Sequence, residues 1–159
     1  MEEDNFWLGE DFDLAAETPI NFIETRLHDL SPFSAHEVEI DGVVYKTAEH
    51  AYHALRLVPE VRYKIEAARS PLDAWRIAQA EKRAGNNLDF NKDALMEKIF
   101  RAKLTQHEDV RRVLLLTRGR ELHKVFPADS YWGTGVNSSG QNKMGQLWMK
   151  LRAEYTGEA

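Results

Sequence analysis

Apolar and polar positions along the chain follow two different patterns, one typical of strands and one typical of helices. Residues 20–25 are rich in β-branched and aromatic side chains, which predicts a strand. Residues 38–45 form a second strand-like stretch around Asp41-Gly42, a dipeptide typical of a hairpin turn. We therefore expect the N-terminal third to supply a small antiparallel sheet.

Start and stop signals of helices follow this part. Thr47 stands at an N-cap position, and Ser70 precedes Pro71 at a first helical position, with Gly85 just past the predicted end. The patterns predict helices over 48–57, about 60–68, 71–84, 92–106, 108–118 and about 144–155, with a short strand at 121–126.

Two of these helices carry an apolar stripe that should face a core. One stripe consists of Leu95, Ile99 and Ala102. The stripe of the last helix consists of Met144, Leu147, Trp148, Leu151 and Tyr155. The expected fold class is α+β, a single domain with mostly helices packed on a small antiparallel sheet.

The composition agrees with one globular domain. The chain has 159 residues, of which 43% are hydrophobic and 30% charged. It contains no apolar run near the roughly 18 residues needed to cross a bilayer. Residues 1–18 carry seven acidic and no basic side chains, so we expect an acidic N-terminal arm before a domain over 19–155. An acidic start does not fit a secretory signal, and we expect a cytoplasmic protein without membrane contact.

Charge and cysteine content exclude several classes of function. The chain has no cysteine, which excludes disulfides, thiolate nucleophiles and cysteine-based zinc sites. Its formal net charge of −5 argues against a protein that holds nucleic acid through broad neutralisation of phosphates. A local basic pocket remains compatible with this charge.

The segment Ser130 to Arg152 contains a glycine-rich run before the last helix. It matches neither GxxxxGK[ST] nor GxGxxG, because Ser138 stands at the third glycine position. Glycines before a helix N-terminus can expose amide groups that bind an anion, here beside Asn142 and Lys143. The alternative is a tight connection that needs positive φ angles.

The segment TAEHAYHALR at 47–56 places His50 and His53 on one helix face. It matches neither HExxH nor HxxEH, so we favour surface or core histidines over a metal site. Glu49 lies in the first turn, where the helix dipole stabilises negative charge. It is either a capping aid or a catalytic carboxylate.

Two further stretches carry candidate chemistry. Arg101 and Lys103 suit phosphate recognition, and a desolvated lysine is a nucleophilic amine, although a solvated helix face is the more ordinary explanation of both residues. Asp129 beside Tyr131 and Trp132 places a carboxylate next to a flat stacking surface, as recognition of a base requires. Buried aromatic side chains at a strand end are the alternative.

In this order, the motifs resemble those of the NADAR family, also called YbiA-like and named for its association with NAD and ADP-ribose. The resemblance runs from about residue 20 to 152. It rests on LSPFSAHEVEIDG at 30–42, TAEHAYHA at 47–54, Ser70-Pro71, RAKLTQH at 101–107 and DSYWGTGVNSSGQNKMGQLWMKLR at 129–152.

The resemblance implies an α+β fold and N-glycosidase chemistry. Two activities are associated with the family: removal of ADP-ribose from the amino group of guanine in nucleic acid, and cleavage of ribosylamino intermediates of riboflavin synthesis. Both break a ribose C1–N bond at an exocyclic amine. Such a site needs a carboxylate near C1, a proton donor for the nitrogen and a water molecule, but no metal or cofactor.

The resemblance also implies roles for residues. Glu49 is the first candidate for the carboxylate that orients ribose or water, and Asp129 is the second. Lys103 neutralises phosphate or, alternatively, attacks an opened ribose to form a Schiff base. The expected substrate-binding residues are His50, Arg56, Arg101, Trp132, Gly133, Gly140 and Asn142. The hypothesis expects Glu49 and the glycine run to face one substrate.

Some positions depart from the family pattern and keep other functions open. Arg56 and Leu57 stand where many members have lysine and phenylalanine, and a guanidinium cannot form a Schiff base. Thr134 replaces a common acid, and Leu88 replaces a tryptophan of some members. A catalytically silent module that binds ADP-ribose or a nucleotide is therefore an alternative. A scaffold whose acidic arm recruits a basic protein is another.

Overall fold

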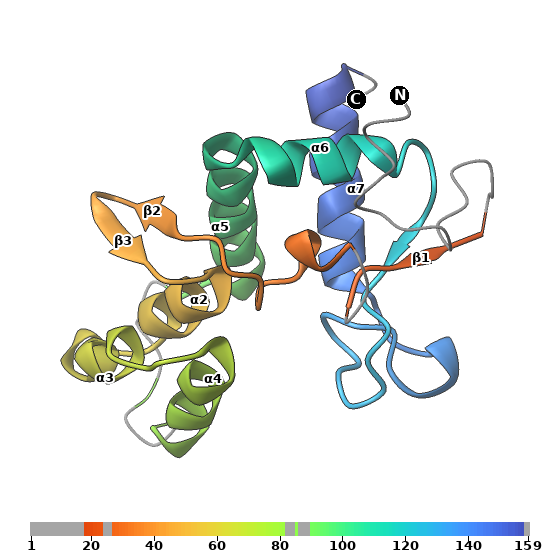
Figure 1. Cartoon of the computed structure of the whole chain (residues 1–159). Helices are drawn as coiled ribbons and strands as arrows, with labels where there is room; N and C mark the ends of the chain where they lie inside the picture. The colour runs from red at the N-terminus through yellow and green to blue at the C-terminus, as the bar shows by residue number, and fades with distance from the viewer. Residues whose placement is uncertain (1–17, 24–26, 82–84, 86–89, 158–159) are drawn as a thin grey trace. The chain divides into compact units, whose positions relative to one another are not determined.

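The computed structural model describes residues 18–23, 27–81, 85 and 90–157, and Figure 1 labels its α-helices and the strands β1 to β3. The chain divides into two compact units. The central unit spans 32–108, and the terminal unit joins the segment up to residue 31 with the chain from 109 onward. Each unit combines helices with a two-stranded sheet, which confirms the predicted α+β class. Most of the predicted acidic arm, residues 1–17, and Leu88 lie outside the described residues.

The sheet of the central unit is the predicted hairpin. Strands β2 (Val38–Ile40) and β3 (Val43–Tyr45) pair antiparallel, with Val38 opposite Tyr45. Asp41 and Gly42 both have positive φ angles, +50° and +83°, as a two-residue hairpin turn requires. The prediction of this hairpin is confirmed.

Helix α2 (Ala48–Arg56) packs against three other helices of the central unit. These are α3 (Arg62–Glu66), which follows a short 3₁₀ turn, α4 (Pro71–Ala80) and α5 (Lys92–Gln106). The predicted N-caps of α2 and α4 are confirmed, because Thr47 Oγ1 accepts from His50 N and Ser70 Oγ accepts from Asp73 N. The fold of this unit therefore places the 47–56 motif in its interior.

Two details of the predicted helices are wrong. Helix α4 ends at Ala80 rather than near residue 84, because the backbone of Glu81 (φ −91°, ψ 7°) leaves the helical region. The buried stripe of α5 is Met96, Ile99, Phe100, Lys103 and Leu104 instead of Leu95, Ile99 and Ala102. Leu95 and Ala102 are only half-buried, since α2 and β2 contact a neighbouring face of α5.

The sheet of the terminal unit is parallel, which corrects the prediction of one antiparallel sheet. Strand β1 (Ile20–Asn21) pairs with β4 (Leu122–His123), and Ile20 N donates to Glu121 O over 2.8 Å. Among the described residues, Ile20 and Asn21 of the predicted strand at 20–25 pair with a strand about 100 residues later rather than with 38–45. Only the tertiary structure decides such a pairing.

Helices α6 (Glu108–Leu116) and α7 (Lys143–Thr156) complete the terminal unit. Met144, Trp148 and Leu151 are buried as predicted, and Trp148 Nε1 donates to Leu30 O over 2.8 Å. Leu147 is only half-buried and Tyr155 is 52% exposed, so the apolar stripe is narrower than predicted. The buried Arg152 takes part in this face by donating to Thr117 Oγ1 over 2.8 Å.

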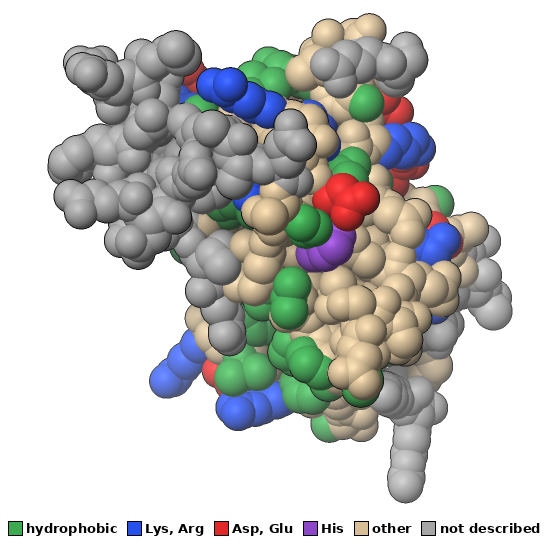
Figure 2. Space-filling model, turned by 90° about the vertical axis from the view of Figure 1, so that its right-hand side faces the viewer, with side chains coloured by type: hydrophobic (Ala, Val, Ile, Leu, Met, Phe, Trp, Pro, Cys, Tyr) green, Lys and Arg blue, Asp and Glu red, His purple; other side chains and the backbone are tan. Residues whose placement is uncertain are grey.

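The surface carries mixed charge. On the face that Figure 2 shows, the visible Lys and Arg side chains stand apart and are interspersed with acidic ones. In the part of the chain that the structure describes, every helix is too short or too polar to cross a membrane.

Candidate active site

An acid, an imidazole and a guanidinium follow one another along one face of α2. Glu49, His53 and Arg56 are four and three residues apart, a spacing that places them on the same side of a helix. His53 Nε2 lies 2.6 Å from Glu49 Oε1, and Arg56 Nε lies 2.9 Å from His53 Nδ1. We name this continuous set of hydrogen bonds the Glu49–His53–Arg56 chain.

Burial makes this chain of hydrogen bonds well defined. Glu49 is 8% and His53 4% exposed, while Arg56 is half-buried. Burial lowers the pKa of Arg56, and the nearby Tyr52 and Glu49 partly oppose this effect. No hydrogen bond from any residue that the structure describes reaches Glu49 Oε2. The carboxylate thus has one oxygen held by His53 and one with remaining capacity to accept.

His50 has a structural environment of its own. Its Nε2 donates to Ala68 O over 3.0 Å, which leaves Nδ1 to accept from Thr47 Oγ1 at 2.7 Å. The ring is 1% exposed, and burial lowers its pKa. Both nitrogens are therefore engaged with the protein, as in a core histidine rather than a metal ligand. Its predicted substrate-binding role stays a prediction.

The two cations predicted on α5 lie on different faces of that helix. Arg101 is exposed and lies 3.6 Å from Glu97, an ion pair at the surface. Lys103 has no exposed surface, and its Nζ donates to Ser34 Oγ over 2.5 Å. The solvated-face interpretation therefore describes Arg101 but not Lys103.

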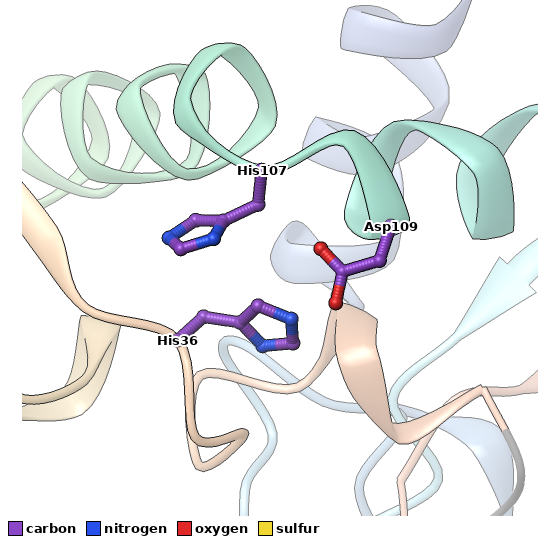
Figure 3. A group of neighbouring side chains, drawn as sticks. All are labelled: His36, His107 and Asp109. Atoms are coloured by element: carbon purple, nitrogen blue, oxygen red, sulfur yellow. The ribbon is translucent and has the colours of Figure 1, made fainter.

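Ser34 connects Lys103 to an imidazole. Ser34 Oγ lies 2.8 Å from His36 Nδ1, and the ring of His36 contacts the ring of His107 edge to face at 4.8 Å. Figure 3 shows these two rings, the first from the loop before β2 and the second at the end of α5. His107 Nε2 in turn donates to Glu37 O. Both imidazoles are potential metal ligands by chemistry, and both already have one nitrogen in a hydrogen bond.

Asp129 organises the loop of the terminal unit. Its Oδ1 accepts from the amides of Tyr131 and Trp132 at 3.1 and 2.9 Å, and its Oδ2 lies 2.7 Å from Lys124 Nζ. Burial raises the pKa of Asp129, but the Lys124 ammonium and the two amides outweigh it, so the pKa lies below its ordinary value. These bonds explain the aspartate as a loop stabiliser, and its catalytic role stays a prediction.

The glycine-rich run uses its amides within the loop. The amides of Gly140, Gln141 and Asn142 donate to loop carbonyls at 2.6 to 2.8 Å. The first amides of α7, those of Lys143 and Met144, donate to Tyr131 O and Trp132 O. Because these donors are already engaged, the structure favours the tight connection over an open anion site.

The remaining predicted residues of this loop are also explained by packing. A Cβ at Gly133 would lie 2.8 Å from Asp129 O, and one at Gly140 would lie 2.6 Å from Gly133 O, so no larger residue fits. The side chain of Asn142 accepts from Lys124 N and donates to Leu122 O, both at 2.9 Å. Trp132 is half-buried with its ring 4.9 Å from that of Tyr131. Ligand binding by these residues stays a prediction.

The structure thus brings some of the predicted site residues into contact with one another and leaves others apart. It brings Glu49 and Arg56 together through His53, whose part the sequence reasoning missed although the i, i+4, i+7 spacing was visible. It brings Asp129 into one loop with Trp132 and the glycines. The prediction that Glu49 and this loop act on one substrate concerns residues of both units and stays a prediction.

Comparison with known proteins supports the family resemblance that the motifs indicate. The N-glycosidase YbiA of Shigella boydii is 35% identical over 146 residues, which cover 89% of this chain and 91% of that protein. The riboflavin biosynthesis protein PYRR of Zea mays, a chloroplast protein, is 30% identical over 144 residues, covering 80% of this chain but 23% of that protein.

A solved structure supports the same relationship. The NMR structure of Escherichia coli YbiA superposes with a TM-score of 0.80 at 29% identity, covering 95% of this chain and 92% of that one. The NADAR domain family matches residues 21–156, which include parts of both units. The chain therefore belongs to the NADAR domain family.

Proposed function

We propose that this protein is an N-glycosidase that releases ADP-ribose from the exocyclic amine of guanine in nucleic acid. Hydrolysis of an N-glycosyl bond, the coarser part of this statement, follows from membership of the NADAR family and from the similarity to the N-glycosidase YbiA. The guanine substrate is our own extension, and it rests on the ribose C1–N chemistry that the motifs imply.

The observation that carries the proposal is the environment of Glu49. This carboxylate is nearly buried, lies in the first turn of α2, and is held through one oxygen by His53 at 2.6 Å. A fixed acid with one oxygen of remaining acceptor capacity suits a water molecule or a ribose hydroxyl. This is the role required beside a carbon that becomes positively charged.

The reaction balances with water as the only co-reactant. The bond between ribose C1 and the guanine amine breaks, its electron pair stays on nitrogen, and C1 becomes oxocarbenium-like. Water adds its oxygen to C1 and gives up one proton toward Glu49, while the leaving nitrogen gains one proton. The products are free ADP-ribose and the unmodified base.

Turnover by the wild-type protein is the first test. Guanine-ADP-ribosylated DNA is incubated with the protein, and free ADP-ribose is measured by mass spectrometry. We expect release by the wild type, and a loss of about a hundredfold or more in kcat for Glu49→Gln, because general acid–base groups contribute about 10² to 10⁴. Glu60→Gln is the matched control at an exposed position. Binding of ADP-ribose without release would instead support the silent binding module.

Lys103 offers a covalent route that a separate experiment distinguishes. Its amine is buried and donates to Ser34, which favours Glu49 as the reacting group. Borohydride added during turnover reduces a Schiff base to a stable adduct. We expect no adduct on the protein, and an adduct of ADP-ribose mass on Lys103 would overturn the preference for Glu49.

A ribosylamino intermediate of riboflavin synthesis is the second candidate substrate. The similarity to the plant PYRR protein favours it. Equal concentrations of the two substrates, assayed in parallel, decide between them through the ratio of their kcat/KM values. We expect the higher kcat/KM for the guanine substrate. A higher kcat/KM for the ribosylamino intermediate would make that metabolite the proposed substrate instead.

A further inference from the structure

The hydrogen bonds of the Glu49–His53–Arg56 chain fix where the hydrogen of the imidazole lies. The guanidinium nitrogen Nε of Arg56 can only donate, so His53 Nδ1 must accept at their 2.9 Å separation. The remaining ring hydrogen is then on Nε2. This nitrogen lies 2.6 Å from Glu49 Oε1 and donates to it.

Without Arg56, either ring nitrogen of His53 could carry the hydrogen. A ring with its hydrogen on Nδ1 would turn a lone pair toward the carboxylate of Glu49, and the two acceptors would repel each other. The donor of Arg56 excludes the tautomer with hydrogen on Nδ1. Since His53 is 4% exposed, water has little access to replace the donor at Nδ1.

We propose that His53 and Arg56 are positioning residues for Glu49. His53 holds one carboxylate oxygen, and Arg56 holds His53 in the tautomer that can donate. The inference deepens the proposed function and rests on it, because it assigns the residues that orient the reacting acid. It also gives Arg56 a role that requires neither a Schiff base nor contact with the substrate.

The tautomer is tested without any substrate. Nitrogen-15 NMR of the imidazoles reports which ring nitrogen carries hydrogen. For His53 of the wild type we expect hydrogen on Nε2 alone, and for Arg56→Met a mixture of the Nε2–H and Nδ1–H tautomers. Arg76→Met, which removes an exposed arginine of α4 paired with Asp73 at 3.7 Å, should leave His53 unchanged. Hydrogen on Nδ1 in the wild type would overturn the inference.

Kinetics separate positioning from substrate binding. With guanine-ADP-ribosylated DNA as the substrate, Arg56→Met should lower kcat about tenfold or more, a loss typical of residues that orient a reacting ligand, with little change in KM. A rise in KM alone would mean that Arg56 binds substrate. Unchanged kcat and KM would remove both roles.

A conservative variant guards against a folding defect. The amide of His53→Gln offers both a donor and an acceptor, whereas His53→Leu offers neither. We expect His53→Gln to retain clearly more kcat than His53→Leu at equal thermal stability. Equal losses in the two variants would contradict the positioning role. Failure of the wild type on every tested substrate would instead refute the proposed function, while the NMR result would still decide the tautomer.

Discussion

His50 and His53 lie three residues apart on α2 and have different roles in the structure. His50 donates to the carbonyl of Ala68 and accepts from Thr47, so it ties α2 to the backbone that follows α3. His53 instead connects Glu49 to Arg56. Neither ring has the open pair of nitrogens that a metal pair on one helix face would present.

His50 makes stability depend on pH. Burial lowers its pKa below the ordinary 6.5, so below about pH 6.5 the unfolded chain binds a proton that the folded ring resists. Stability should therefore fall as the pH drops through this value, by at most about 1.4 kcal/mol per pH unit for one proton.

The His50→Gln variant isolates this contribution. Glutamine keeps an amide donor for Ala68 but has no proton to gain, so the slope of unfolding free energy between pH 5 and pH 7 should become shallower than in the wild type. Urea denaturation across this range measures the slope. The same slope in both proteins would show that another group titrates.

Asp129 gives the opposite kind of test. Because the pKa of Asp129 is lowered in the folded state, its carboxylate stabilises the fold at pH values above its ordinary pKa of 3.8. This stabilisation is lost as the pH falls below 3.8 and through the lower pKa of the folded state. Asp129→Asn keeps an acceptor for the two amides but loses the charge facing Lys124. We expect a loss of about 1 kcal/mol at pH 7 that shrinks in acid.

Asp41→Asn is the stability control, and the turnover of Asp129→Asn tests the predicted catalytic role. Asp41→Asn, at an exposed turn position paired with Lys98, should cost much less at pH 7. If folded Asp129→Asn retains turnover, the aspartate is a loop stabiliser. If turnover disappears while stability is unchanged, the predicted catalytic role of Asp129 gains support over the structural one.

At the scale of elements, the contact between α7 and β4 depends on a single small residue. A Cβ at Gly145 would lie far inside van der Waals contact with the carbonyl oxygen of Leu122 and close to the side chain of Asn142. Since the obstacle is backbone, the helix itself has to move away from the strand.

Gly145→Ala should therefore lower the free energy of unfolding by about 3 kcal/mol, the range of severe overpacking. Gly119→Ala is the matched control, because a Cβ there meets nothing within 4 Å, and we expect a change near zero. Urea denaturation of both variants gives the comparison. Equal effects would mean that α7 does not approach β4 as closely as described.

At the scale of the whole molecule, the net charge limits how the proposed nucleic acid substrate would be held. The net charge is −5, and the visible cations in Figure 2 are scattered. A protein of this kind lacks the broad release of counterions that gives strong and salt-sensitive binding of DNA. Recognition should depend on the modified nucleotide rather than on the flanking phosphates.

We accordingly expect unmodified DNA to bind weakly, with Kd above about 10 µM at 0.15 M salt. Fluorescence anisotropy measures this affinity, and the dependence of kcat/KM on salt measures the electrostatic part of recognition. The slope of log kcat/KM against log salt should be shallow. A steep slope would reveal a basic surface that the charge pattern does not indicate.

Local patterns predicted local structure well. Thr47 and Ser70 start helices because a side-chain oxygen can accept from an amide three residues later, whatever surrounds them. The Asp41-Gly42 hairpin formed because both residues accept positive φ angles. The motifs from residue 20 to 152 also identified the family, since their order along the chain is specific.

Only the tertiary structure decided which strands pair and which helix faces and side chains are buried. The pairing of β1 with β4, the buried face of α5 and the burial of Lys103 depend on segments far apart in the chain, whereas the amides of the glycine run donate to carbonyls of the same loop. Glu49, His53 and Arg56 share a face by spacing alone. The hydrogen-bond geometry that connects them, and with it the tautomer, arises because packing excludes water from the imidazole.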